Sequence, residues 1–135
     1  MTTLSEAKKS INDRFIASWG ATTAYTFANE EFQQPAADQA WVRLTIVNYD
    51  GKQETIGKKG SRKYERYGFI IANIFTPIEV GTSKGDELGT ALQVLFEGER
   101  FDGVVVNNST IKDKGVDDQW YHTMFEAEFI FYETK

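Results

Sequence analysis

Apolar residues recur every three or four positions near the start of the chain, which is the spacing of one helix face. They fall at Leu4, Ala7, Ile11, Phe15 and Trp19. Thr3 and Glu6 have the spacing of a capping box ahead of this face. Gly20 follows the last periodic residue, and glycine is common just after a helix end. The pattern therefore predicts a helix over Thr3–Trp19.

A second helical stripe lies in the later half of the chain, at Leu88, Ala91, Leu92, Leu95 and Phe96. Ser83 and Asp86 precede it with the spacing of a capping box, although aspartate is shorter than the usual glutamate. We predict a helix over Asp86–Phe96 with an apolar face directed at the core.

Five other stretches are rich in β-branched and aromatic residues, as is typical of strands. They are Ala24–Phe27, Trp41–Tyr49, Tyr67–Phe75, Val104–Asn108 and Trp120–Glu133. Tyr67–Phe75 is almost continuously apolar, which predicts a central strand buried on both faces, and Pro77 is expected to end it. In the last strand, alternate positions from Tyr121 to Phe131 are expected to face the core, with those between them largely exposed.

Polar stretches separate these strands. Asp50-Gly51 predicts a turn, and the following Lys52–Ile56 is only a weak strand candidate. Gly57–Ser61 is expected to be a mobile loop, and Thr110–Asp118 a polar loop before the last strand.

The order of elements indicates an α+β protein. We predict two layers, with a mainly antiparallel sheet and two helices packed on one of its faces. The chain has 135 residues and shows no internal repeat or low-complexity linker. We therefore expect a single domain over residues 1–135, large enough to bury its own core.

Charge is unevenly distributed along the chain. The net charge is −5, which disfavours a general nucleic-acid-binding protein. Residues 51–66 nevertheless carry six cations and two carboxylates. This segment is either a solvated hairpin or a basic projection that meets an acidic partner or a phosphate backbone. No apolar run approaches the length of a membrane span, so no membrane partner is expected.

No combination of residues predicts catalysis, and we expect that the protein is not an enzyme. The chain has no cysteine and one histidine, His122, which excludes the common zinc sites. Gly57–Ser61 lacks the spacing of a phosphate-binding loop. Asp113, Asp117 and Asp118 do not match a calcium loop. We therefore predict no catalytic, cofactor or metal residues, and no cofactor.

Several segments together resemble the small tail terminator proteins of long-tailed bacteriophages. The matching segments are Trp41-Val42-Arg43-Leu44-Thr45-Ile46, Arg66-Tyr67-Gly68, Phe69–Phe75 with Thr76-Pro77 and Gly81, and the helix Leu88–Phe96. The helix Thr3–Trp19 and the segment Phe32-Gln33-Gln34-Pro35 also fit. The resemblance covers most of the chain, although none of these motifs is as specific as a metal or nucleotide signature.

The resemblance implies a structural protein without catalysis or cofactor. Such proteins form a hexameric ring that binds the end of the tail tube, stops its polymerisation and presents a docking surface for the head. The implied partners are other copies of the chain, the tail tube protein and a head-completion protein, while DNA passes through the ring without specific binding. The implied location is the virion tail, and the host cytoplasm during assembly.

We predict two interface arms, chosen for their charge and for the lack of an evident packing role. Their residues are Lys58, Lys59, Arg62 and Lys63 in the basic segment, and Lys112, Asp113 and Lys114 in the later polar segment. Three other functions remain open. The protein is alternatively a head–tail connector, a tail tube subunit, or a small-ligand-binding α+β domain in which the aromatic residues line a pocket.

Overall fold

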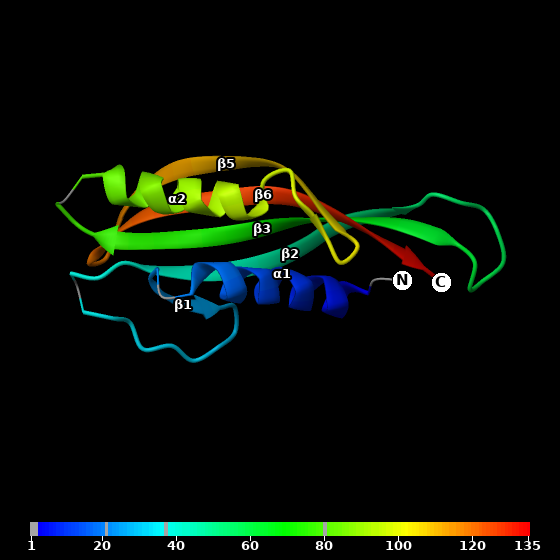
Figure 1. The fold of residues 1–135 in the computed structure, drawn as a ribbon, viewed down its shortest axis with the longest axis horizontal. Coiled ribbons are helices and arrows are strands. Elements are labelled where there is room, and N and C mark those ends of the chain that lie inside the picture. The colour runs from blue at the N-terminus through cyan, green and yellow to red at the C-terminus, as the bar shows by residue number, and fades with distance from the viewer. Residues whose placement is uncertain (1–2, 21, 37, 80) are drawn as a thin grey trace.

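The chain folds into two helices and a six-stranded sheet, which confirms the α+β class (Figure 1). The computed structural model describes residues 3–20, 22–36, 38–79 and 81–135. The elements are α1 (Leu4–Trp19), β1 (Ala24–Phe27), β2 (Trp41–Gln53), β3 (Lys63–Pro77), α2 (Ser83–Phe96), β4 (Arg100–Phe101), β5 (Val104–Asp117) and β6 (Trp120–Thr134).

The strands form one mixed, curled sheet in the order β1-β2-β3-β6-β5-β4. β1 runs parallel to β2, and every other neighbouring pair is antiparallel. The longest ladder joins β3 to β6, from Lys63 opposite Thr134 to Pro77 opposite Trp120. The prediction that β3 is central is therefore confirmed, and β6 is central as well.

The α1 boundaries are set by the residues that the sequence indicates. The Thr3 hydroxyl accepts a hydrogen bond from the Glu6 backbone N–H at 3.2 Å, and the Glu6 carboxylate accepts one from the Thr3 N–H at 3.4 Å. Gly20 ends the helix with φ of 53°, a backbone conformation that glycine adopts without strain. α2 begins at Ser83, three residues before the predicted start, and its N-terminal cap residue Thr82 makes no side-chain capping bond.

One hydrophobic core contains apolar side chains from both helices and from alternate positions of the long strands. α1 contributes Ala7, Ile11, Phe15 and Trp19, which are four of the five predicted apolar positions, while the fifth, Leu4, is half-buried and packs against this core. α2 contributes Leu88, Leu92, Leu95 and Phe96, and β6 contributes Phe125, Ala127, Phe129 and Phe131. The predicted inward positions of the last strand are thus buried, except that Tyr121 is only half-buried.

Two predicted interruptions of strands are wrong. Asp50 and Gly51 do not form a turn but continue β2, which pairs with β3 as far as Gln53 opposite Tyr64. A bulge between Asn48 and Asp50 accommodates them. Residues 110–117 belong to β5, because their backbone pairs with β6 as far as Asp117 opposite Trp120. In both places, pairing with a distant strand overrides a local preference for a turn or loop.

The burial of β3 and β6 also differs from the prediction. β3 is buried at alternate positions, such as Ile70 and Ala72, while Phe69 and Ile71 on the other face are half-buried. Likewise, the residues predicted as largely exposed in β6, including Met124 and Glu126, are half-buried. A nearly continuous apolar run therefore reflects one face in the core and a second face that is partly shielded.

Candidate interface surfaces

The β2–β3 hairpin extends beyond the body of the molecule at one end of its long axis (Figure 1). Residues 54–62 form its tip, which we call the basic tip. Hydrogen bonds inside the tip hold its shape: the Glu54 N–H donates to the Lys63 carbonyl at 2.7 Å, and the Ser61 N–H to the Lys58 carbonyl at 2.9 Å. The Arg62 Nε donates to the Gly57 carbonyl at 2.9 Å. The predicted loop is therefore a closed, hydrogen-bonded turn.

The cations of this hairpin fall into two groups. Lys52, Lys63 and Arg66 form ion pairs within the chain, with Glu65 at 3.9 Å, Glu54 at 3.5 Å and Glu133 at 3.1 Å respectively. Lys63 Nζ also lies 4.3 Å from the centre of the Tyr132 ring. In the described part of the chain, no carboxylate pairs with the three cations at the tip, which are Lys58, Lys59 and Arg62.

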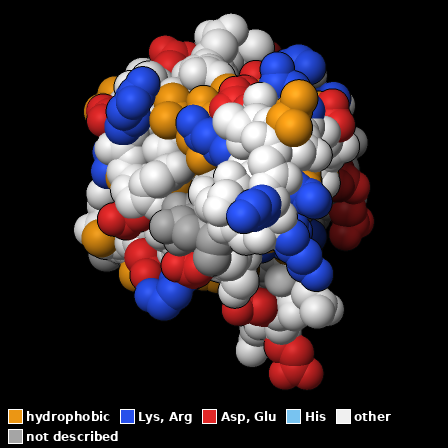
Figure 2. Space-filling view, turned by 90° about the vertical axis from the view of Figure 1, so that its right-hand side faces the viewer, with side chains coloured by type: hydrophobic (Ala, Val, Ile, Leu, Met, Phe, Trp, Pro, Cys, Tyr) orange, Lys and Arg blue, Asp and Glu red, His pale blue; other side chains and the backbone are white. Residues whose placement is uncertain are grey.

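The basic tip also presents an apolar side chain that sequence reasoning missed. Ile56 has a relative exposure of 102%, the highest among the exposed large hydrophobic residues. A lone isoleucine in a polar stretch is a detectable signal, but the sequence did not show that a hairpin would hold it at its tip. Seen from the hairpin end, several Lys and Arg side chains lie across the face turned to the viewer (Figure 2). The tip thus combines unpaired cations with one exposed apolar group.

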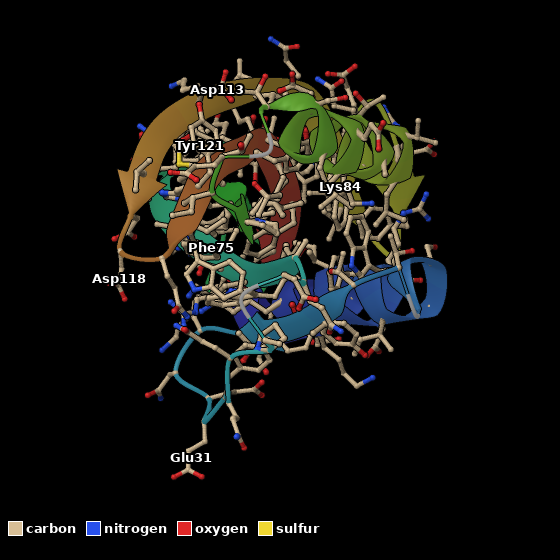
Figure 3. All side chains as sticks on the ribbon, turned by 90° about the vertical axis from the view of Figure 1, so that its left-hand side faces the viewer. Glu31, Phe75, Lys84, Asp113, Asp118 and Tyr121 are labelled. Atoms are coloured by element: carbon tan, nitrogen blue, oxygen red, sulfur yellow. The ribbon has the colours of Figure 1, made fainter. Side chains whose placement is uncertain are left out.

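The opposite end of the molecule carries exposed carboxylates that were not predicted as a site. We call this surface the acidic end. It consists of Glu30, Glu31, Asp38, Asp117 and Asp118. The first three lie in the segment between β1 and β2, and the other two at the β5–β6 turn. Figure 3 looks at this end and shows Glu31 at the tip of a projecting loop, with Asp118 at the turn. No cation forms an ion pair with these carboxylates in the described residues.

A small aromatic cluster packs beneath the segment that carries part of the acidic end. The Trp41 and Phe75 rings stack at 4.3 Å, and Phe32 packs on Trp41 at 5.0 Å. Trp120 Nε1 donates a hydrogen bond to Gln34 Oε1 at 3.2 Å. These contacts fix the 28–36 segment against the ends of β2, β3 and β6. Glu31, Phe32 and Gln33 line a shallow hollow on its surface.

The second predicted arm lies on a strand rather than in a loop. Lys112, Asp113 and Lys114 are exposed residues of β5, with Lys112 opposite Met124 and Asp113 opposite Thr123. β4 pairs only with Val104 and Val105, so this part of β5 forms the outer edge of the sheet. A bulge follows between Asp113 and Gly115. Lysines and bulges at sheet edges commonly prevent unwanted strand pairing. We therefore regard the basic tip as a stronger candidate for an interface than this second arm.

The structure does not bring the two predicted arms together. The four hairpin residues lie at one end of the long axis, while β5 runs along the far edge of the sheet (Figure 1). Lys63 differs from its three neighbours because its charge is already paired. The basic tip and the β5 edge are thus separate surfaces.

His122 occupies a structural position. Its Nε2 lies 2.8 Å from Asn73 Oδ1, and its ring stacks on Phe75 at 4.9 Å. Burial lowers the pKa of His122 below its ordinary value, because it disfavours the charged ring. Within the described ranges, no three His, Asp or Glu side chains come together as metal ligands.

The aromatic residues that motivated a ligand pocket are mostly packed inside the protein. Phe125, Phe129 and Phe131 belong to the core, with relative exposures of at most 1%. Neither described helix combines the length and apolar character needed to span a bilayer.

Comparisons with known proteins show the fold alone. No protein-family model and no curated protein sequence match this chain. Among the solved structures that resemble it is a chain, of no stated function, with a TM-score of 0.65 and 14% sequence identity. The similarity covers 92% of this chain and 94% of the other. The architecture is therefore shared over nearly the whole length of both chains.

Proposed function

We propose that this protein is a tail terminator of a long-tailed bacteriophage. In this role it forms a hexameric ring on the end of the tail tube, stops tube growth and presents a surface to which a head-completion protein docks. It acts by binding, without catalysis or a cofactor. It works in the virion tail, after assembly in the host cytoplasm.

The observation that carries this proposal is the β2–β3 hairpin with its basic tip. This projecting turn carries an exposed Ile56 and three cations that pair with no carboxylate of the described residues, so it contributes little to its own fold. Such a surface is suited to contact another protein, where a buried apolar residue and flanking charges supply affinity and orientation. Contacts between different surfaces of identical subunits close into a ring when the rotation between neighbours is suitable.

The segments that resemble the terminator family form the framework behind this surface. They correspond to α1, β2, β3 and α2, whose apolar residues share one core. We take the subunit to be a two-layer unit with both helices on the same face of the sheet. The net charge of −5 favours a ring through which DNA moves without binding, because like charges repel.

The test is to add the protein to tail tube subunits of the same phage during polymerisation and to measure tube length by negative-stain electron microscopy. A terminator stops elongation at amounts far below one copy per tube subunit, because each tube end needs a single ring. An equal amount of an unrelated acidic protein of similar size is the control.

Three results would overturn the proposal. Incorporation along the whole tube would identify a tube subunit instead. Unchanged tube length, with no ring at the tube ends, would exclude a terminator. A ring that binds preassembled heads but not tubes would favour the head–tail connector.

A further inference from the structure

We infer that the basic tip of one copy docks on the acidic end of the next copy in the ring. This rests on the proposed function, since it names the contact that joins neighbouring subunits. It commits the basic tip to a second copy of this chain as its partner.

The first argument is charge complementarity. Lys58, Lys59 and Arg62 have no carboxylate partner in the described part of their own chain. The carboxylates of the acidic end likewise have no cation partner there. Lys112 and Lys114 lie on the same strand as Asp117, but no ion pair joins them. Each copy therefore carries two surfaces of opposite charge whose charges its own fold leaves unpaired.

The second argument is position. The two surfaces lie at opposite ends of the long axis (Figure 1), so the tip cannot reach the acidic end of its own chain. A contact between them must join two copies head to tail. Each copy then uses one of its two surfaces for each neighbour, and such head-to-tail contacts generate a ring when the rotation between neighbours closes.

The third argument is an apolar anchor. Ile56 is fully exposed on the tip, and the acidic end has a shallow hollow lined by Glu31, Phe32 and Gln33. The Phe32 ring packs against Trp41 with ring centres 5.0 Å apart. This wall of the hollow is therefore already fixed before a second copy binds. Seating Ile56 there would bury an apolar side chain amid complementary charges, as in the centre of protein interfaces.

A nucleic acid is a poorer partner for the same tip. Within the described ranges, the tip offers three cations without a carboxylate partner, and the whole chain has a net charge of −5, which opposes approach to a phosphate backbone. A second copy, in contrast, supplies the complementary surface at the same concentration as the tip itself.

The test uses two charge-reversal variants and their mixture. The tip variant is K58E/K59E/R62E, and the end variant is E30K/E31K/D38K. We expect each alone to self-associate at least about tenfold more weakly than the unmodified chain in light scattering and sedimentation, since several ion pairs become repulsive. An equimolar mixture should regain association. In the mixture, the acidic tip of the tip variant faces the basic end of the end variant. The unmodified tip of the end variant faces the unmodified end of the tip variant. The two variants therefore alternate around an even-numbered ring.

The matched control is K8E/R100E, which is compared with the two-residue tip variant K58E/K59E. Both change the net charge by the same amount, and the control does so at exposed positions of α1 and β4 that form no ion pair and lie outside both surfaces. The control should associate like the unmodified chain. Thermal unfolding by circular dichroism should show that all of these variants remain folded, because none of the changed residues contributes to the core. I56S tests the apolar anchor separately and should weaken association without any change in charge.

Three outcomes would overturn the inference: a strictly monomeric unmodified chain, a tip variant that associates normally, or a mixture that does not recover. The tube-length assay distinguishes this failure from that of the proposed function. If rings of the tip variant still stop tube growth, the terminator proposal stands and the subunit contact lies elsewhere. If the mixture recovers but the protein does not affect tubes, the contact is real and the terminator function is wrong.

Discussion

Gly68 of β3 lies directly opposite Phe129 of β6, so close that the strand has no room for a side chain there. A β-carbon at Gly68 would lie 2.5 Å from Phe129 Cζ and 2.4 Å from the Val47 carbonyl oxygen. The carbonyl belongs to the neighbouring strand β2 and cannot move without disturbing the ladder. The glycine thus allows a phenylalanine to fill the core beneath the sheet.

Gly68→Ala should therefore destabilise the protein by about 1–3 kcal/mol, the usual cost of adding a methyl group to a packed core. Gly57→Ala is the matched control. The nearest atom to its β-carbon is the Ser61 carbonyl oxygen at 3.9 Å, so its stability should hardly change. Urea unfolding monitored by tryptophan fluorescence measures the stability of both variants. Equal midpoints for the two variants would contradict the close approach.

The lowered pKa of His122 should make stability depend on pH. Burial lowers this pKa from its ordinary value of 6.5. The unfolded chain therefore takes up a proton before the folded chain does, and the contribution of His122 is present above pH 6.5 and lost as the pH falls through the folded pKa. His122→Gln retains an amide that can bond Asn73 but does not titrate. The loss of stability between pH 7 and pH 5 should be smaller in this variant, as measured by thermal unfolding.

Tyr67 should lose its hydroxyl proton only at unusually high pH. The nearby Glu65 carboxylate raises the pKa of Tyr67 to about 12, because it favours the neutral hydroxyl, which can donate a hydrogen bond, over the phenolate. Since the folded pKa exceeds the ordinary value of 10, the associated stability is present below pH 10 and is lost as the pH rises towards 12. An ultraviolet titration should show a late tyrosinate step that disappears in Tyr67→Phe and moves to lower pH in Glu65→Ala. Persistence of the step in Tyr67→Phe would assign it to another tyrosine.

Gln34 should be one of two anchors of the 28–36 segment, together with the Phe32 ring that packs on Trp41. It accepts the hydrogen bond of Trp120 Nε1, and Trp120 has only 2% relative exposure. Gln34→Ala leaves this buried N–H without a partner and should cost about 1–3 kcal/mol. The exposed neighbour Gln33 makes no such bond, so Gln33→Ala is the control. Faster proteolytic cleavage within the segment in Gln34→Ala alone would support this anchoring role.

Local patterns predict the presence of both helices because their signals are contained in adjacent residues, although the predicted Ser83–Asp86 capping box does not cap α2, which follows Thr82 without a side-chain cap. The α1 core positions and capping residues were all identifiable, since a helix bonds within its own segment. The strand ends were not predicted well. The continuation of β2 through Asp50-Gly51 and the length of β5 depend on pairing with β3 and β6, which are distant in sequence. Turn-favouring residues there lie in strands because their partners hold them.

The candidate site was predicted only in part, for a related reason. Among the residues that the structure describes, no carboxylate pairs with Lys58, Lys59 or Arg62. Lys63, in contrast, forms an ion pair with Glu54, which its position in the sequence alone does not reveal. The acidic end was missed because its residues come from two segments, around Glu31 and around Asp118, that only the fold brings to the same end. Surfaces assembled from separate loops leave no continuous pattern in the sequence.

The interior position of β6 has a consequence for how the protein is made. β6 follows all the other strands in the chain, yet it lies between β3 and β5. Until it is synthesised, β3 lacks one neighbour, and β5 has no long partner strand to join it to the rest of the sheet. Contacts between such distant segments also tend to slow folding. An incomplete chain therefore cannot form the finished sheet. Only copies translated through β6 would present both ends in the right relative position, which would keep defective subunits out of an assembly.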